Sequence, residues 1–268
     1  MAALTDFAGR LAVVTGAGSG IGRELVAQLV AARARVAACD IRLGAVRRTR
    51  TEVLKRWPDG QVTAHECDVT DAPALARFRS EVSEAHHSDA LHLLINNAGA
   101  VGGASFVADD PSEWERTFAV NFHGTYLATR AFLPMLLAAD QGVVVNVASV
   151  NALWASLGNG TAHTAYSTAK FAVRGFTESL IGDFALHAPH LSAVLVLPGH
   201  VRTAMPPPPP PWRRAFNAAL AHTSATTASD AAAQILHGIQ TGQWRILIGA
   251  DAERVDELIR ADPSSAYA

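Results

Sequence analysis

The alternation of short apolar runs with longer helical segments constrains the fold of this chain more than any other feature. The apolar runs are rich in β-branched residues, and the segments between them have the apolar spacing of helices with one buried face. We predict strands at residues 11–15, 35–40, 62–67, 91–96, 143–148, 192–197 and 245–248. We predict helices at residues 21–32, 43–57, 73–85, 111–139, 166–187 and 229–240. This order predicts an α/β fold with a single doubly wound parallel sheet of about seven strands and helices on both faces.

Composition limits the class of protein. A chain of 268 residues with 49% hydrophobic and 17% charged residues predicts one domain over residues 1–268. A formal net charge of -2 argues against a nucleic-acid partner. Cys39 and Cys67 lie in apolar segments, so we expect buried thiols in a reducing compartment. With no secretory signal and no membrane-length apolar run, we expect a soluble, cytoplasmic protein.

A glycine-rich turn at residues 15–22 joins the first predicted strand to the first predicted helix. In this context Gly16 allows a tight turn, Gly20 lets the backbone approach a pyrophosphate, and Gly22 permits close packing of the helix. The helix N-terminus would face the phosphates. The turn therefore predicts a dinucleotide site; the alternative is a purely structural turn.

Asp40 indicates which dinucleotide is bound. It ends the second predicted strand. Its separation from Gly22 is close to the spacing of about 20 residues at which an acidic side chain binds the adenosine ribose hydroxyls. A carboxylate repels a 2′-phosphate, and Ser19 offers no cation to bind one, so NAD is favoured over NADP. Arg42 is the neighbouring cation that argues for NADP, although we expect it to point to solvent.

Tyr166 and Lys170 stand four residues apart and so share one face of a predicted helix. A phenol has an ordinary pKa of about 10, and an adjacent ammonium favours its ionised form. We therefore expect Lys170 to lower the pKa of Tyr166, so that the pair acts as an acid–base device.

With these motifs on the chain, residues 11–248 resemble the short-chain dehydrogenase/reductase family. The matching motifs are the glycine turn, Asp68-Val69, residues 96–99, the Tyr166/Lys170 pair and Pro198-Gly199. The resemblance implies a catalytic tetrad of Asn121, Ser149, Tyr166 and Lys170. It also implies cofactor contacts at Gly16, Ser19, Gly20, Ile21, Asp40, Asp68, Val69, Asn97, Ala98, Gly99, Tyr166, Lys170, Pro198, Gly199, Val201 and Thr203.

Ser149 and Asn121 each have a physical interpretation of their own. Ser149 ends the fifth predicted strand, at the edge where doubly wound sheets bind ligands, and its hydroxyl could hold a substrate oxygen opposite Tyr166. The alternatives are a serine that caps the turn, and Ser156 in its place. The interval between Ser149 and Tyr166 is longer than the family usually has. A buried Asn121 amide could bind a water that links Lys170 to solvent, or could bond to neighbouring backbone.

The predicted substrate pocket is largely apolar, which suggests a hydrophobic alcohol. Its expected lining is Val150, Asn151, Leu153, Trp154, His200, Val201, Met205 and Trp212. Residues 199–227 contain six consecutive prolines at positions 206–211, and we predict that they form a substrate lid. The alternative is an exposed spacer.

These residues predict an NAD-dependent oxidoreductase that interconverts a secondary alcohol and its ketone. The alternatives are an NADP-dependent carbonyl reductase and a non-catalytic dinucleotide-binding protein. No glycine-framed nucleophile turn surrounds Ser149, which argues against a serine hydrolase. The histidines show no metal-ligand spacing, so no metal is expected. The resemblance implies a homotetramer or homodimer that associates through the helices at residues 111–139 and 166–187.

Overall fold

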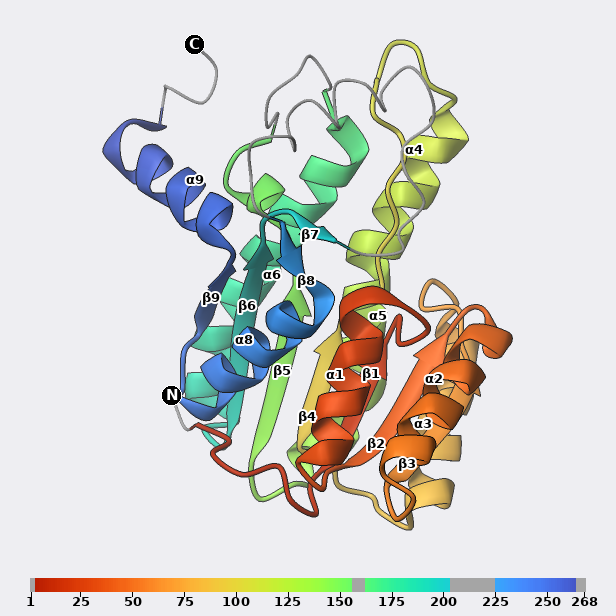
Figure 1. The fold of residues 1–268 in the computed structure, drawn as a ribbon. Coiled ribbons are helices and arrows are strands. Elements are labelled where there is room, and N and C mark those ends of the chain that lie inside the picture. Colours follow the sequence, from red (N-terminus) through yellow and green to blue (C-terminus); the bar gives the residue numbers. More distant parts are fainter. Residues whose placement is uncertain (1–2, 156–161, 203–224, 264–268) are drawn as a thin grey trace.

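The computed structural model describes residues 3–155, 162–202 and 225–263. Within them a parallel sheet has the strand order β3-β2-β1-β4-β5-β6-β9, as Figure 1 shows. Its strands are β1 (Leu11–Thr15), β2 (Arg35–Asp40), β3 (Gln61–Glu66), β4 (Leu93–Asn96), β5 (Gly142–Val147), β6 (Leu191–Pro198) and β9 (Arg245–Ile248). This confirms the predicted doubly wound α/β fold. Ser156, Thr203, Met205, Trp212 and the prolines at 206–211 lie outside the described residues.

Helices cover both faces of the sheet (Figure 1). The cluster that includes Ala12 and Val14 of β1 contains residues of α1 (Gly20–Ala31), α2 (Leu43–Arg56) and α8 (Ala228–Gln240). The cluster on the other face, which includes Leu11 and Val13, contains residues of α3 (Ala72–His86), α5 (Gly124–Leu137) and α6 (Thr164–His187). Successive side chains of β1 thus enter two different cores, which explains why the central strands are continuously apolar.

The single helix predicted over residues 111–139 is wrong in one respect. The structure has α4 (Pro111–Phe118), a π-helical turn (Ala119–His123) and then α5. The Asn121 side chain lies in the π-helical turn, and its Nδ2 donates to the Thr117 carbonyl at 2.8 Å. This carbonyl is the one that the Asn121 amide would use in an α-helix, so a side chain competes with the regular backbone pattern.

Several short elements were not predicted. They are the 3-10 turn Val150–Ala152, the paired strands β7 (Val201–Arg202) and β8 (Thr226–Thr227), and the C-terminal helix α9 (Ala250–Ala261). All of them lie beyond the carboxyl ends of β5, β6 and β9. No helix among the described residues has the length and apolar character needed to cross a bilayer.

A chain of buried amides and hydroxyls ties the middle of the sheet to the helices on one face. Asn96 of β4 donates to Asn146 of β5 at 2.8 Å and to Thr129 of α5 at 2.9 Å. Asn146 in turn donates to Thr177 of α6 at 2.9 Å. All four side chains are buried. Because Asn96 and Asn146 stand close to the ends of β4 and β5, this ladder fixes the strand ends from which the site is built.

We predict that Asn146→Ala lowers the free energy of unfolding by about 3 kcal/mol, because it removes the buried hydrogen bonds to Asn96 and Thr177 and leaves a cavity in their place. Denaturant titration measures the change. Gln243→Ala is the control, since it removes only an exposed side-chain hydrogen bond to Thr241. Equal stability of the two variants would contradict the role given to the ladder.

Candidate active site

The glycine turn has the backbone that its sequence predicted. Gly16 and Gly20 have positive φ angles of 63° and 53°. A Cβ on Gly22 would overlap the Gly16 carbonyl, so the first turn of α1 packs directly against the loop. Asn97 supports the loop from β4, because its Nδ2 donates to the Thr15 carbonyl at 3.0 Å. The turn is therefore a tight cradle at the N-terminus of α1, which fits a pyrophosphate.

Asp40 is buried at the end of β2, beside this cradle. One carboxylate oxygen accepts from the Gly18 amide at 3.0 Å, and the other accepts from the Arg42 amide at 2.9 Å. A Cβ on Gly18 would overlap the Asp40 carboxylate, so this close approach of the loop to Asp40 requires a glycine. The Arg42 side chain is 69% exposed, and its Nε lies 3.7 Å from Asp40. A carboxylate accepts about four hydrogen bonds, so Asp40 retains capacity for ribose hydroxyls.

Asp68 and Val69, which the resemblance implies contact the cofactor, follow β3. Asp68 Oδ1 accepts from the amide and the hydroxyl of Thr70, at 2.9 and 2.8 Å. Val69 is buried and lies so close to Gly124 of α5 that a Cβ there would be 2.6 Å from it. The Cys67 amide donates to the Asp40 carbonyl at 3.1 Å, which holds this segment next to Asp40.

Lys170 is buried on α6, and its ammonium reaches back to the sheet. Nζ donates to the Val147 carbonyl at the end of β5 at 3.0 Å and lies 5.5 Å from the centre of the Tyr166 ring. Burial lowers the pKa of Lys170 to about 8. A Cβ on Gly99 would make only an ordinary contact with Nζ, at 3.7 Å, but would crowd Asn121 Oδ1 at 3.0 Å, so Gly99 leaves room for the Asn121 amide beside Lys170.

Tyr166 lies on the same face of α6, as predicted. The direction of its pKa is not the expected one: burial raises the pKa, and the hydrogen bond with Ser149 opposes that rise. The expectation of a pKa lowered by Lys170 was wrong, because desolvation of the phenolate raises the pKa by more than the hydrogen bond with Ser149 lowers it.

Ser149 lies two residues after the end of β5, where it caps the 3-10 turn. Its hydroxyl accepts from the Asn151 amide and donates to Asn151 Oδ1, both at 3.2 Å. Asn151 Nδ2 also donates to Ser167 on α6 at 3.3 Å. Asn151 was predicted to line the substrate pocket; its amide supports the catalytic candidate Ser149 and joins it to α6.

Asn121 is fully buried, and the NH2 group of its side-chain amide donates to backbone carbonyls. Nδ2 donates to the Ala100 and Thr117 carbonyls at 2.7 and 2.8 Å. Oδ1 is buried and has no donor among the described residues. It lies beside Gly99, as the Lys170 ammonium does, so an acceptor and a cation approach the same point of the loop after β4.

The segment after β6 is the last of the site segments at the carboxyl ends of the strands. The Gly199 amide donates to the Ile248 carbonyl at 2.9 Å, and the His200 amide donates to Asp251 of α9 at 2.5 Å. Sequence reasoning missed Asp251; an acidic residue just after a short apolar run and a glycine was the available signal. Asp40, the glycine turn, residues 97–99, Ser149 and Pro198-Gly199 follow neighbouring strands and line one edge of the sheet. No cluster of metal-ligating side chains occurs among the residues that the structure places.

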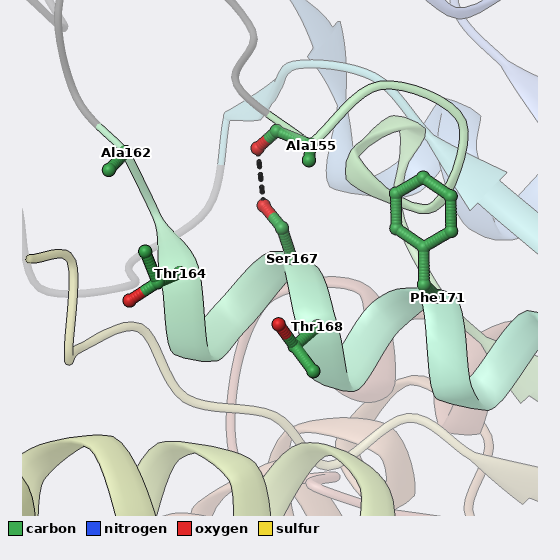
Figure 2. A pocket seen from close by; sticks show the side chains of 6 residues that line it. All are labelled: Ala155, Ala162, Thr164, Ser167, Thr168 and Phe171. Carbon is green, nitrogen blue, oxygen red and sulfur yellow. Dashed lines mark hydrogen bonds between the residues drawn. The ribbon is translucent and has the colours of Figure 1, made fainter. Parts of the chain in front are cut away.

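A pocket of about 390 Å³ lies on α6, as Figure 2 shows, but it is not this site. Its lining is Ala155, Ala162, Thr164, Ser167, Thr168 and Phe171. At 100° per residue, its helical residues face away from Tyr166 and Lys170. It contains none of the predicted lining residues, such as Trp154 and His200.

The comparisons with known proteins agree with this geometry. The short chain dehydrogenase family model matches residues 10–213. The Mycobacterium tuberculosis protein SadH, provisionally described as an oxidoreductase, is 33% identical over 98% of this chain and 94% of its own. The 2-(R)-hydroxypropyl-CoM dehydrogenase of Xanthobacter autotrophicus is 34% identical over 73% of this chain and 76% of its own.

Two solved structures are similar along almost the whole chain. A short chain dehydrogenase/reductase from Burkholderia phymatum in complex with NAD has a TM-score of 0.84 and 26% identity, covering 97% of this chain and 96% of its own. A metagenomic short-chain oxidoreductase in complex with NADP has a TM-score of 0.71 and 27% identity, covering 90% and 97%. The chain therefore belongs to the short-chain dehydrogenase/reductase family and is an oxidoreductase of that type.

We predict that Lys170→Met stabilises the fold at pH 7, because it removes a buried charge. Below pH 8 the ammonium is charged in both states and the folded protein carries the full cost of burial. Between about pH 8 and 10.5 only the unfolded state keeps the proton, so wild-type stability rises with pH. The rise relative to Lys170→Met is up to about 3 kcal/mol.

Denaturant titrations across this pH range measure the difference. The other lysine of the chain, Lys55, is exposed and provides the control, since Lys55→Met should follow the wild type at every pH. A gap between wild type and Lys170→Met that does not change with pH would contradict the lowered pKa.

Proposed function

We propose that the protein is an NAD-dependent oxidoreductase that interconverts a secondary alcohol and its ketone. The observation that carries this proposal is the Tyr166 phenol, which is hydrogen-bonded to Ser149 and shares a helix face with the buried Lys170 ammonium, beside a glycine cradle. Bound in that cradle, the dinucleotide would accept or donate the hydride. The protein's own residues then need only place the substrate oxygen and move one proton.

Tyr166 is the proposed proton carrier. In oxidation its phenolate takes the hydroxyl proton of the alcohol, and in reduction its phenol returns a proton to the carbonyl oxygen. Ser149 would hold the same oxygen by turning its hydroxyl proton away from Asn151 Oδ1, while the Asn151 amide keeps the Ser149 oxygen in place. Lys170 would bond the nicotinamide ribose, and Asn121 would hold a water that carries protons away.

Tyr166 and Lys170 share one environmental effect on their pKa values. Burial raises the pKa of Tyr166 and lowers that of Lys170, because it disfavours either charge alone. A bound ligand that excludes water from the site would act on both groups, and a phenolate and an ammonium on one helix face would then stabilise each other.

Asp40 supports NAD as the cofactor. Its buried carboxylate faces the glycine turn, where a 2′-phosphate would meet a negative charge. The NAD complex of the Burkholderia phymatum relative agrees with this choice, whereas the metagenomic relative binds NADP. The remaining cofactor contacts of the proposal are those predicted for Ser19, Ile21, residues 68–69 and 97–99, Pro198, Gly199, Val201 and Thr203.

The substrate class is proposed as a secondary alcohol with an apolar substituent. The Xanthobacter relative is named for a 2-hydroxypropyl compound, which is a secondary alcohol. Trp154 and His200 remain proposed lining residues, and residues 199–227 remain a proposed lid. We also propose a single domain over residues 1–268, in a cytoplasmic homodimer or homotetramer. Two buried free thiols are consistent with a reducing compartment.

We predict that wild-type protein reduces NAD with members of a secondary-alcohol panel, followed by NADH absorbance, and that Tyr166→Phe lowers the rate by about 100-fold or more. The binding of NAD should be nearly unchanged, because the ring still packs. Tyr126→Phe is the control, since Tyr126 is exposed on α5. If Tyr166→Phe kept more than about a tenth of the rate, another residue would carry the proton.

We predict that Asp40→Ser combined with Ser19→Arg changes the preference from NAD toward NADP by at least about a hundredfold, because a repulsive charge is replaced by an attractive one. Ser19 caps α1 without a side-chain hydrogen bond, so its loss costs no cap. Steady-state kinetics with both cofactors measure the ratio, with Ser80→Arg on the exposed face of α3 as control. A wild type that already prefers NADP would refute the assignment.

A further inference from the structure

The Asp251 carboxylate lies at a junction of four chain segments. Asp251 is in the first turn of α9, and its carboxylate accepts from the His200 amide at 2.5 Å. His200 stands between the end of β6 and the start of β7. A residue of the C-terminal helix thus holds the backbone of a turn that lies about 50 residues earlier in the chain.

Two glycines make room for this carboxylate. A Cβ on Gly199 would overlap the Asp251 carboxylate, and a Cβ on Gly249 would lie 2.7 Å from its Oδ1 and 2.8 Å from Thr226 Oγ1. Gly249 also has a φ of +92°, which other residues rarely adopt. Both segments next to the Asp251 carboxylate therefore have a glycine at the point of closest approach.

The same junction connects the segment that follows β6 to the end of β9 and to β8. The Gly199 amide donates to the Ile248 carbonyl at 2.9 Å, which pairs the ends of β6 and β9. The Thr226 amide donates to the His200 carbonyl at 3.1 Å, which begins the pairing of β7 with β8. His200 is thus held through its amide by Asp251 and through its carbonyl by Thr226.

This turn belongs to the edge that carries the proposed catalytic residues. The Ala148 amide, next to Ser149, donates to the Val196 carbonyl of β6 at 2.8 Å. Val255 of α9 packs against the cluster that contains Ala148 and Leu197. In Figure 1, α9 lies beyond the carboxyl end of β9, the end at which β6 and β5 also stop. Ligands of doubly wound sheets bind along that edge.

α9 has an attachment of its own that does not involve Asp251. Arg245 of β9 donates to Asp256 of α9 at 3.0 Å, and both side chains are largely buried. Loss of the Asp251 carboxylate should therefore free the turn at Gly199 and His200 without detaching the helix.

We propose that Asp251 is a positioning residue of the active site, whose carboxylate fixes the Gly199-His200 turn so that it presents a constant surface to the substrate and the cofactor. The kinetic part of this inference rests on the proposed function. A carboxylate suits the task, because a hydrogen bond to an ionised acceptor is stronger than a neutral one, and the N-terminus of α9 favours a negative charge.

The test compares Asp251→Ala, Asp251→Asn and the control Glu253→Ala, an exposed acid in the same helical turn. Asp251→Ala should raise the KM for the alcohol and lower kcat, together at least about tenfold in kcat/KM, since small displacements at a reacting centre are costly. Asp251→Asn keeps an acceptor oxygen and should recover most of the loss. Hydrogen exchange of the His200 amide should be faster in Asp251→Ala alone.

Gly199→Ala tests the same contact from the other side, because its Cβ would displace the carboxylate. It should reproduce the kinetic loss, and combining it with Asp251→Ala should add little. Gly182→Ala is the matched control, since a Cβ there meets no atom within 4 Å. These variants keep the test decisive if Asp251→Ala folds poorly.

Wild-type kinetics and wild-type His200 exchange in Asp251→Ala would overturn the inference, as would an equal kinetic loss in Glu253→Ala. The proposed function fails differently, through a wild type that turns over no alcohol with either dinucleotide. Exchange at His200 would still decide the role of Asp251 in that case.

Discussion

The site depends on one energetic constraint, the burial of the Lys170 ammonium at the edge of the sheet. Desolvation disfavours that charge, so interactions with the surrounding residues have to offset its cost in free energy. The Val147 carbonyl accepts its hydrogen bond, and Gly99 lets Asn121 Oδ1 approach the loop beside which the ammonium lies. These groups come from β5, from the loop after β4 and from the π-helical turn. The buried amide ladder through Asn96 and Asn146 keeps those elements in register.

Much of the fold could be predicted from the sequence, because buried parallel strands are continuously apolar. The bounds predicted for β1, β2 and β9 agree with the structure, and the glycine turn lies between strand and helix as expected. The π-helical turn at Asn121 could not be predicted, since periodicity does not show that a side chain takes a backbone carbonyl. α9 was missed because its helix is largely polar, with Ala252 and Asp256 as its buried residues.

The candidate site was predictable in its residue types and less so in its energetics. Spacing alone put Tyr166 and Lys170 on one face of α6, and strand ends placed Asp40 and Ser149 along one edge. The direction predicted for the Tyr166 pKa shift was wrong, because the spacing of residues does not reveal how far a phenol is desolvated. The roles of Asn151 and Asp251 came only from contacts between segments that the sequence does not relate. Expectations for Met205, Trp212 and Thr203 concern residues beyond those that the structure describes.

The most direct test of the central claim follows the hydride itself. Wild-type protein is incubated with NAD and an active secondary alcohol that carries deuterium on the carbinol carbon, and the reduced cofactor is analysed by mass spectrometry. The account predicts that the reduced nicotinamide gains one deuterium, and that alcohol deuterated only on its hydroxyl transfers none. Reduced cofactor without the carbon-bound label would contradict hydride transfer from the alcohol, and with it the roles assigned to Tyr166, Ser149 and Lys170.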